Sequence, residues 1–461
     1  MRTLTIETPN KIGEEVLLKG WINARRNMGK IVFLDFRDRD GIVQVVGVPA
    51  ELDEKSQEEL KRVRPEWVVE IKGIVNERGA KQKNSEMPTG TVEVLAKELV
   101  VISEAQTPPF EIDKDTKIIG EELRLKHRYL DLRSERMKKN LEARHKINRF
   151  AREYLSAKGF WEIETPCLTK GTPEGAREFI VPSRLHKGEF YVLPQSPQQF
   201  KQLLMVSGVE KYFQIARCFR DEDQRGDRQP EFTQLDLEMS FMEEEEILSL
   251  VEEMVIGLAE KEFPNLKIQR KPFPRLAYAE AMEKYESDKP DLRNDKTDKT
   301  ELAFCWVVDF PLFERNEEGS LVSTHHPFTR PRDEDMTLLD KSPEKIRARA
   351  YDLVLNGFEV GGGSLRIFKS DLQKKIFEIL GLEEEEIKNR FGHMLDAFSY
   401  GVPPHGGIAL GLDRLAAVLQ CEENIREVIA FPKTSDARDL LIGAPSSLPK
   451  QTLDDANIKL K

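Results

Sequence analysis

The segment FRDEDQRGDRQPEFTQLDLEMSF, residues 219–241, places ten charged side chains of both signs beside an aromatic ring. Arg220 stands at the mouth of a charged loop, where a guanidinium can grip a phosphate with two parallel hydrogen bonds. Phe232 follows the loop and offers a ring on which a planar base can stack. A solvated, self-neutralising surface loop explains the segment equally well when it is taken alone.

A second phosphate site is indicated by GIALGLDRLAAVLQ, residues 407–420. The pattern predicts a strand, a glycine turn and a helix that starts near Leu412. Arg414 then lies in the first helical turn, where the backbone N–H groups and the helix dipole already favour anions. The alternative is a packed strand–helix joint that carries an incidental arginine.

Two shorter motifs add groups of a different chemical kind. In GFEVGGGSLRIF, residues 357–368, three glycines allow close approach to a ligand, and Glu359 is a natural Mg²⁺ ligand beside a polyphosphate. A flexible turn is the alternative for this motif. In THHPFT, residues 324–329, adjacent histidines on an extended chain point apart, so a shared zinc ion is not expected. Hydrogen-bond donation to a substrate carboxylate and simple packing remain the two interpretations of this pair.

Strands and helices of ordinary pattern must position these groups. Residues 232–241 alternate strictly, which predicts a strand with Leu235, Leu237, Met239 and Phe241 on its buried face and polar side chains on the other. Residues 211–220 predict its partner strand, and 140–158 predict an amphipathic helix that Gly159 terminates. Because the chain contains no GxGxxG or GxxxxGK[ST] motif, neither a Rossmann fold nor a P-loop is expected.

The first hundred residues predict a small β domain. Three strands, a helix and two strands follow one another, which is the order of an OB-fold barrel, a common binder of single-stranded nucleic acid. A generic small barrel is the alternative. The predicted elements are strands 16–22, 31–38 and 42–48, helix 51–64, and strands 67–75 and 91–102.

Composition narrows the setting in which these sites work. The 461 residues carry a net charge of -11, so any RNA must be bound through local basic patches. The sequence has neither an apolar run long enough for a membrane span nor a signal-peptide pattern at its start. Its four cysteines are far apart and lie in apolar contexts, as is typical of buried thiols. A cytoplasmic location is therefore expected.

Long ordered motifs support a more specific hypothesis. The chain resembles the bacterial-type aspartyl-tRNA synthetases, members of subclass IIb of the class II aminoacyl-tRNA synthetases, from about residue 15 to the C-terminus. The motifs that carry the resemblance are ETPCLTKGTPEGAREF, PQSPQQFKQLLM, CFRDEDQRGDRQPEFTQLDLEMSF, THHPFT, EVGGGSLRIF and GIALGLDR. It implies a multidomain α+β protein: an OB-fold anticodon-binding domain at 1–103, a hinge at 104–130, and a catalytic domain at 131–461. That catalytic domain is expected to hold an antiparallel sheet flanked by helices.

The resemblance also implies roles for individual residues. The implied catalytic residues are Arg220, Arg414 and Glu359, and the implied Mg²⁺ ligands are Asp352 and Glu359. The implied ATP-binding residues are Arg220, Asp221, Glu222, Gln229, Phe232, Glu359, Gly411, Leu412, Asp413 and Arg414. The implied aspartate-binding residues are Glu174, Ser196, Gln198, Gln199, Phe200, Lys201, Arg220, Asp236, His325 and Arg366. The implied anticodon-binding residues are Arg26, Phe33, Gln44 and Glu93. The resemblance assigns no role to Glu238.

The implied reaction joins L-aspartate to tRNA(Asp), with ATP as substrate and Mg²⁺ as metal, in a homodimer. It leaves open whether tRNA(Asn) is charged as well. A non-aminoacylating RNA-binding paralogue is the alternative, and Lys201 disfavours asparagine as the amino acid. The family usually inserts a domain after FPRLAYAEAMEKYESDKPDLRN, residues 273–294. Only a few residues remain here before FCWVVDFPLFE, so a deletion is expected near 294–303.

Overall fold

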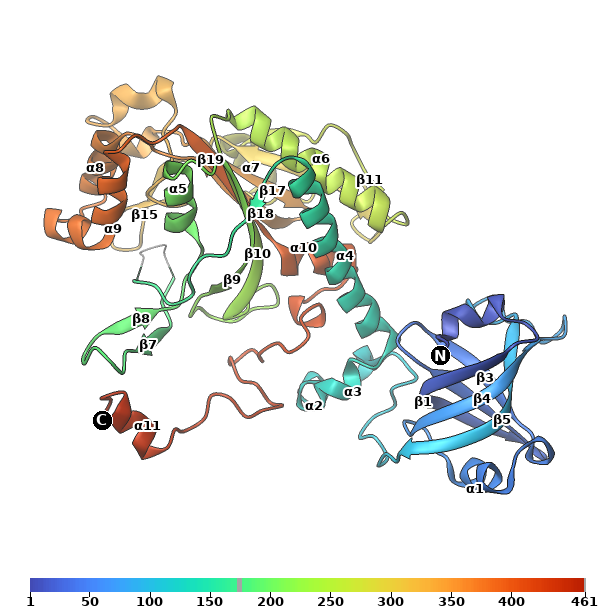
Figure 1. Cartoon of the computed structure of the whole chain (residues 1–461). Coiled ribbons are helices and arrows are strands. Elements are labelled where there is room, and N and C mark those ends of the chain that lie inside the picture. Colours follow the sequence, from blue (N-terminus) through green and yellow to red (C-terminus); the bar gives the residue numbers. More distant parts are fainter. Residues whose placement is uncertain (172–175, 460–461) are drawn as a thin grey trace. The chain divides into compact units, whose positions relative to one another are not determined.

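The computed structural model describes residues 1–171 and 176–459. These residues form two compact units, Met1–Arg136 and Met137–Lys461, whose helices and strands are labelled in Figure 1.

The first unit contains a closed five-stranded barrel with the strand order β1-β2-β3-β5-β4. The parallel pairing of β3 with β5 completes a ladder that is otherwise antiparallel. Alternate side chains such as Leu18, Phe36 and Ile71 fill the interior, as the two-residue period requires. The barrel elements are β1 (Glu15–Met28), β2 (Ile31–Arg37), β3 (Ile42–Gly47), α1 (Glu54–Arg62), β4 (Val68–Glu77) and β5 (Val92–Ser103). The predicted OB-fold order is confirmed.

A short helical segment follows the barrel. It holds α2 (Glu121–Lys126) and α3 (Arg128–Asp131). The Asp131 carboxylate is fully buried and accepts hydrogen bonds from Arg128 at 2.6 Å and from Arg124 at 3.3 Å. Because a buried charge is costly unless it is paired, this contact fixes the turn between the two helices.

The second unit is built on an eight-stranded sheet with the order β12-β14-β17-β18-β19-β10-β9-β6. The inner strands are antiparallel, as predicted, whereas the two edge pairs, β12–β14 and β6–β9, are parallel. The sheet strands are β6 (Trp161–Glu162), β9 (Lys211–Phe219), β10 (Glu231–Ser240), β12 (Arg275–Ala277), β14 (Phe304–Val308), β17 (Ala350–Leu355), β18 (Phe358–Leu365) and β19 (His405–Gly411). Three small ladders use β7 (Ile180–Pro182), β8 (Phe190–Val192), β11 (Lys267–Ile268), β13 (Glu301–Leu302), β15 (Phe313–Arg315) and β16 (Leu321–Ser323).

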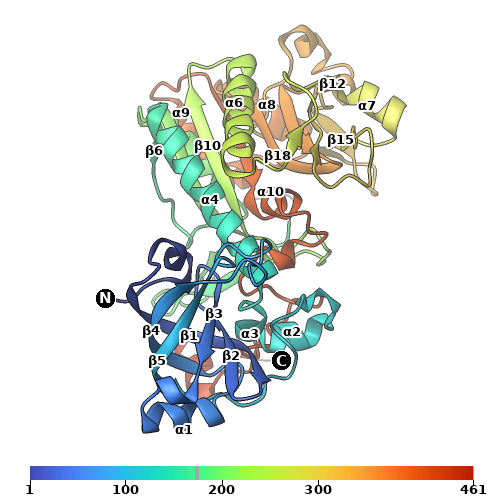
Figure 2. The ribbon, with the colours of Figure 1, turned by 90° about the vertical axis from the view of Figure 1, so that its right-hand side faces the viewer.

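Helices α4 (Glu135–Ala157) and α6 (Glu244–Glu262) run beside each other along the sheet (Figure 2). Their apolar stripes pack against Leu235, Leu237 and Met239 of β10, as predicted for the buried face of that strand. The opposite, polar face of β10 is therefore left for the functional site. The prediction is wrong for Phe241, which follows the end of β10 and is 65% exposed. The remaining helices are α5 (Gln198–Val206), α7 (Tyr278–Tyr285), α8 (Ser370–Ile379), α9 (Glu384–Phe398), α10 (Leu412–Leu419) and α11 (Lys450–Asp455). None of the described helices is long and apolar enough to cross a membrane.

The three glycines of residues 361–363 lie within central strand β18 and do not form a flexible turn. A Cβ on Gly361 would come within 2.2 Å of the Leu410 side chain, and one on Gly363 within 2.3 Å of the Gly407 oxygen. Gly362 faces the other way, and its Cβ would lie 2.9 Å from Asp352 Oδ1. The glycines are therefore needed for close packing of β18 on both of its faces.

The chain closes compactly at the position of the expected deletion. Asp295 accepts hydrogen bonds from the backbone and hydroxyl of Thr297, and Asp298 does the same for Thr300. The side chain of Asn294 donates to Glu301 at 3.0 Å and so bridges the two ends of the turn. Two successive aspartate-capped turns thus join the flanking segments directly.

Candidate active site

A cavity of about 480 Å³ opens over the polar face of β10. Strands β10, β18 and β19, helices α5 and α10, and the loop between β9 and β10 all contribute to its wall. The structure therefore brings together residues that lie more than two hundred positions apart in the sequence. The predicted site residues that line it are Ser196, Gln198, Lys201, Arg220, Glu222, Gln229, Phe232, Asp236, His325, Asp352, Glu359, Arg366, Gly411, Asp413 and Arg414.

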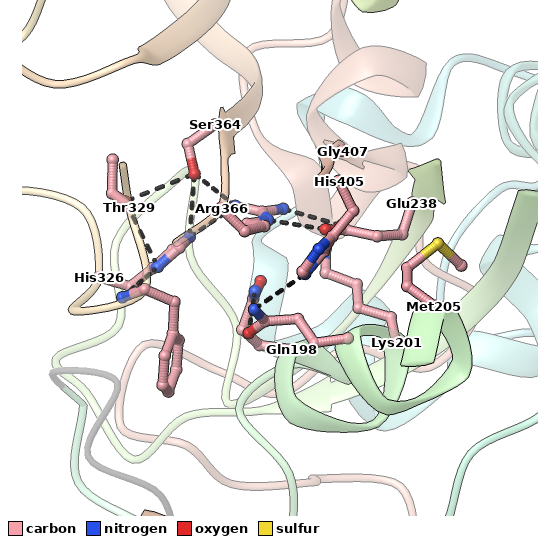
Figure 3. Close-up of polar contacts among 12 residues, drawn as sticks. Gln198, Lys201, Met205, Glu238, His326, Thr329, Ser364, Arg366, His405 and Gly407 are labelled. Atoms are coloured by element: carbon pink, nitrogen blue, oxygen red, sulfur yellow. Dashed lines mark hydrogen bonds and ion pairs between the residues drawn. The ribbon is translucent and has the colours of Figure 1, made fainter. Parts of the chain in front are cut away.

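One end of the cavity holds two buried cations and two buried carboxylates. Lys201 Nζ lies 2.9 Å from Asp236 Oδ2 and 3.3 Å from Glu238 Oε2. Arg366 forms a two-pronged contact with Glu238, from Nε at 2.8 Å and from Nη2 at 3.0 Å (Figure 3). All four side chains are at most 2% exposed. The two positive and two negative charges at this end of the cavity balance one another.

The cations control the ionisation of Glu238. Burial alone would raise its pKa, but Arg366 and Lys201 outweigh burial and lower the pKa to about 2. Burial raises the pKa of Asp236, although Lys201 acts in the opposite direction. Glu238 is therefore the ionised partner that keeps the two cations in place. The carboxylate charge of Asp236 would be stabilised further by another cation, such as a substrate ammonium.

Glu238 and His326 both contact Arg366, and neither was among the predicted site residues. His326 Nε2 accepts a hydrogen bond from Arg366 Nη1 at 2.7 Å, since a guanidinium can only donate. Burial, together with the charge of Arg366, holds the pKa of His326 well below its usual value, which keeps the imidazole neutral. Gly407 leaves room for this arrangement, because a Cβ there would lie 2.2 Å from Glu238 Oε2. The signals in the sequence were the unassigned acidic residue on the polar face of β10 and the histidine pair of THHPFT.

The guanidinium of Arg220 also lines the cavity. The Arg220 side chain stacks over the Phe232 ring, with 5.1 Å between the guanidinium carbon and the ring centroid. Its Nε is buried and has no hydrogen-bond partner among the described residues. A buried donor without a partner is costly unless a ligand completes it. This geometry suits an anion placed between a stacked base and the cationic end.

Arg414 marks the other end of the cavity. Its Nη1 donates to the Glu359 carbonyl at 3.0 Å, and its Nη2 lies 3.2 Å from Asp227 Oδ2. Arg414 thus bridges strand β18 and the loop between β9 and β10, beside the start of α10. The arginine is held in place but remains partly exposed to the cavity, as a phosphate contact requires.

Two carboxylates near Arg414 fit a divalent cation. Asp352 is 6% exposed, and its Oδ1 has no hydrogen-bond partner in the described part of the chain. Burial and the nearby carboxylates of Glu359 and Asp288 raise the pKa of Asp352 well above its usual value. A cation would relieve that repulsion. No three His, Cys, Asp or Glu side chains of residues 1–171 and 176–459 cluster into a metal site, so phosphate oxygens would complete the shell of Mg²⁺.

His325 lines the cavity close to Asp352. Its Nε2 is 3.6 Å from Asp352 Oδ1, and its ring packs edge-on against Phe310. Burial lowers its pKa to about 4. In this conformation His326, and not His325, contacts the cation Arg366.

Several predicted ATP contacts have their side chains committed elsewhere. The Gln229 amide forms a pair of hydrogen bonds with the backbone of Lys433, at 2.7 and 3.0 Å. Asp413 accepts from the Thr233 backbone at 2.8 Å and pairs with Arg144, so its carboxylate anchors α10 to β10 and α4. Leu412 packs in the hydrophobic core, because the first turn of α10 must bury its apolar side. The Gln229 and Asp413 side chains line the cavity and also hold its walls in place.

Other predicted residues lie away from the main cavity. Asp221 is exposed and pairs through its backbone with Arg177. Gln199 and Phe200 face a separate small cavity beside Lys170, because successive residues of α5 point in different directions. Glu174 lies outside the described residues.

The barrel carries its four predicted residues on one outer face. Arg26 pairs in register with Phe33, and Gln44 with Glu93. Arg26 forms a bidentate ion pair with Asp35 at 2.7 and 2.8 Å, and the Gln44 amide donates to Glu93 at 2.9 Å. The ring of Phe33 remains partly exposed between these polar pairs. An aromatic ring framed by hydrogen-bonding groups is typical of a surface that stacks and identifies single-stranded bases.

Comparison with known proteins agrees with this geometry. Residues 120–435 match the class II tRNA synthetases (D, K and N), and residues 16–102 match the OB-fold nucleic acid binding domain. An aspartate--tRNA(Asp/Asn) ligase of Dehalococcoides mccartyi is 41% identical over 588 aligned positions, which cover 98% of each chain. An aspartate--tRNA ligase of Staphylococcus saprophyticus is 40% identical with the same coverage. Since the first alignment exceeds 461 positions, that relative contains residues which this chain lacks.

Solved structures agree on the architecture. The asparaginyl-tRNA synthetase of Pyrococcus horikoshii, complexed with asparaginyl-adenylate, superposes with a TM-score of 0.75 at 26% identity, covering 94% of this chain and 98% of that one. A putative aspartyl-tRNA synthetase of Leishmania major gives the same TM-score at 20% identity, which supports the fold alone. With a matching catalytic family over most of its length and near-full-length relatives that are 40% and 41% identical, this chain belongs to the class II aminoacyl-tRNA synthetases of the D, K and N group.

Proposed function

We propose that this protein is an aspartate–tRNA ligase, which activates L-aspartate with ATP and transfers it to tRNA(Asp). The observation that carries the proposal is the pair of buried cations, Lys201 and Arg366, at the closed end of the cavity. Among the described residues their contacts use two of the three Lys201 donors and four of the five Arg366 donors. One donor on each cation is left for a ligand carboxylate.

These cations also account for the choice of amino acid. A side-chain carboxylate can accept hydrogen bonds from both Lys201 and Arg366. The NH₂ group of an asparagine amide is itself a hydrogen-bond donor, so it would face these donors without an acceptor between them. A buried donor without an acceptor is costly, so the amide is rejected strongly. Asp236 and the polar groups of Ser196 and Gln198 lie in the same cavity and suit the substrate ammonium.

The chemistry follows from the order of groups along the cavity. The substrate α-carboxylate attacks the α-phosphorus of ATP, the bond to the bridging oxygen breaks, and pyrophosphate leaves. Negative charge grows on the phosphoryl oxygens, and Arg220 is positioned to stabilise it while Phe232 stacks the adenine. Mg²⁺ held by Asp352 and Glu359 would supply charge neutralisation of the polyphosphate. The terminal ribose hydroxyl of tRNA then attacks the carbonyl of the mixed anhydride, and AMP leaves.

Exchange of labelled pyrophosphate into ATP tests the proposal. The purified protein is expected to catalyse the exchange only when L-aspartate is present, and asparagine at the same concentration is expected to support little or none. Exchange that depends on asparagine, or no exchange with either amino acid, contradicts the proposed function. The second outcome would favour a non-aminoacylating RNA-binding paralogue.

The polar outer face of the barrel is proposed to bind the tRNA anticodon through Arg26, Phe33, Gln44 and Glu93. A second candidate activity is the charging of tRNA(Asn), which the printed name of the Dehalococcoides relative includes and that of the Staphylococcus relative does not. Aminoacylation of the two purified tRNAs, side by side, distinguishes these activities. The proposed location of the enzyme is the cytoplasm.

A homodimer is proposed from exposed apolar side chains on the edge strand β6 and around the ladder of β7 and β8. Trp161 of β6 is 65% exposed and Ile180 of β7 is 62% exposed, and Leu168, Phe190 and Tyr191 are exposed as well. Large apolar side chains exposed in this way mark contact sites between proteins. Ile180→Lys is expected to shift the protein from dimer to monomer in analytical ultracentrifugation. The exposed Ile442→Lys serves as the control, and an unchanged dimer in the Ile180 variant contradicts this interface.

A further inference from the structure

Lys289 lies at the polyphosphate end of the cavity, although no motif of the sequence pointed to it. Its Nζ is 3.5 Å from Glu359 Oε2, and Arg414 Nη1 lies 3.6 Å from the same oxygen. Lys289 lines the same cavity as Glu359 and Arg414, and its side chain is 39% exposed. One carboxylate oxygen is therefore shared by two cations that both face the cavity.

The backbone that carries Lys289 is held in place. Pro290 is buried, and Leu292 packs against a hydrophobic cluster of the catalytic unit. Ser287 Oγ accepts from the Lys289 backbone N–H at 3.0 Å, and Gln269 donates to the Leu292 carbonyl at 2.7 Å. Lys289 is therefore a positioned lysine that ends in the cavity, unlike the solvated Lys284 of nearby helix α7.

Charge balance indicates what Lys289 binds. Glu359 cannot satisfy two cations and at the same time serve as a metal ligand. If Glu359 turns to Mg²⁺, both Lys289 and Arg414 lose that partner and face the cavity as free positive charges. A polyphosphate supplies several anionic oxygens in that space, and a lysine serves as a point charge for such groups.

We propose that Lys289 binds the terminal phosphates of ATP and the pyrophosphate released from it, which completes a cationic pair with Arg414. This inference rests on the proposed function, because it takes ATP as the substrate. Lys289 touches the leaving group and not the aspartate or the adenine. Its contribution is therefore confined to ligands that carry a β-phosphate.

The test compares two ligands on the same variant by isothermal titration calorimetry. Lys289→Met, which keeps the stem and removes the charge, is expected to weaken binding of ATP about tenfold, the loss typical of one charge-assisted hydrogen bond. A non-hydrolysable aspartyl-adenylate analogue has no β- or γ-phosphate, so its affinity is expected to stay within twofold of the wild type. The KM for pyrophosphate in the exchange reaction is expected to rise in parallel.

Lys284→Met is the matched control, since Lys284 is a solvated lysine on α7 that stacks on Tyr285 away from the cavity. It is expected to leave both affinities unchanged, and Lys289→Arg is expected to restore most of the ATP affinity. Unchanged ATP affinity in Lys289→Met contradicts the inference, and so does an equal loss for both ligands. A wild-type protein that binds ATP but shows no aspartate-dependent exchange contradicts the proposed amino-acid activity and leaves this comparison intact.

Discussion

Replacing Arg220 with alanine is expected to lower the rate of aspartyl-adenylate formation by about a thousandfold, the loss typical of one preorganised donor to a developing oxyanion. Arg220 lines the cavity, and its buried Nε has no hydrogen-bond partner among the described residues. The variant loses the charge that stabilises the transition state and the group that stacks on Phe232. Single-turnover formation of the adenylate, followed by release of labelled pyrophosphate, measures the effect directly.

The matched control for this experiment lies on β9, the strand that directly precedes Arg220. Arg217 of β9 is exposed and pairs with Glu231 on the surface, so Arg217→Ala is expected to keep nearly full activity. A variant of Arg220 that folds normally and forms adenylate at close to the wild-type rate would show that the phosphate lies elsewhere in the cavity.

The second large effect is expected for Glu238→Gln. This change removes the buried charge that holds Arg366 and Lys201, and breaking such a pair by removing one partner costs about 3 kcal/mol or more of unfolding free energy. Because the two cations then shift, the KM for aspartate is expected to rise roughly a hundredfold, as for a small misplacement of a binding group. The KM for ATP, which binds at the other end of the cavity, is expected to change little.

The pH dependence of stability gives an independent test of Glu238. Its folded pKa is about 2, lowered from the usual 4.5, so the ionised form contributes stability that is fully present above pH 4.5 and is lost as pH falls towards 2. The difference in unfolding free energy between wild type and Glu238→Gln is therefore expected to shrink below pH 4.5 in denaturant titrations. Glu231→Gln, at the partly exposed start of the same strand, is expected to cost less than about 1 kcal/mol. A difference that stays constant with pH would contradict the assigned role of Glu238.

Local patterns predicted much of the fold. The alternation in β10 is read directly from neighbouring residues, and its apolar face packs as expected against α4 and α6. The helix at 140–158 and the helix start at Leu412 were predicted for the same reason, because the apolar periodicity and the adjacent glycines are visible within a short stretch of sequence. The parallel pairing of the edge strands depends on contacts between distant segments and has no local signal.

The residue types of the site were predicted, but the contacts that its residues make with one another were not. Arginines suited to phosphate binding are recognisable by residue type and motif, and the resemblance placed Arg220 and Arg414 in one ATP site; both line the same cavity. The role of Glu238 depends on Arg366, which is 128 positions away in the sequence, and no pattern within one strand reveals that contact. Gln229 and Asp413 were predicted as ATP ligands from the resemblance, and no local pattern showed that their side chains also form hydrogen bonds to the backbone that hold the walls of the cavity together.

The aspartate-capped turn at residues 295–300 has a consequence for protein engineering. Its flanking residues, Asn294 and Glu301, are already joined by a hydrogen bond, and the turn is solvent-exposed on the surface of the catalytic unit. A folded guest domain whose own ends lie close together can replace such a turn without pulling on β13 or on the segment that carries Lys289. The position is therefore a natural attachment point for a fluorescent or affinity module that reports on the enzyme while its chemistry continues.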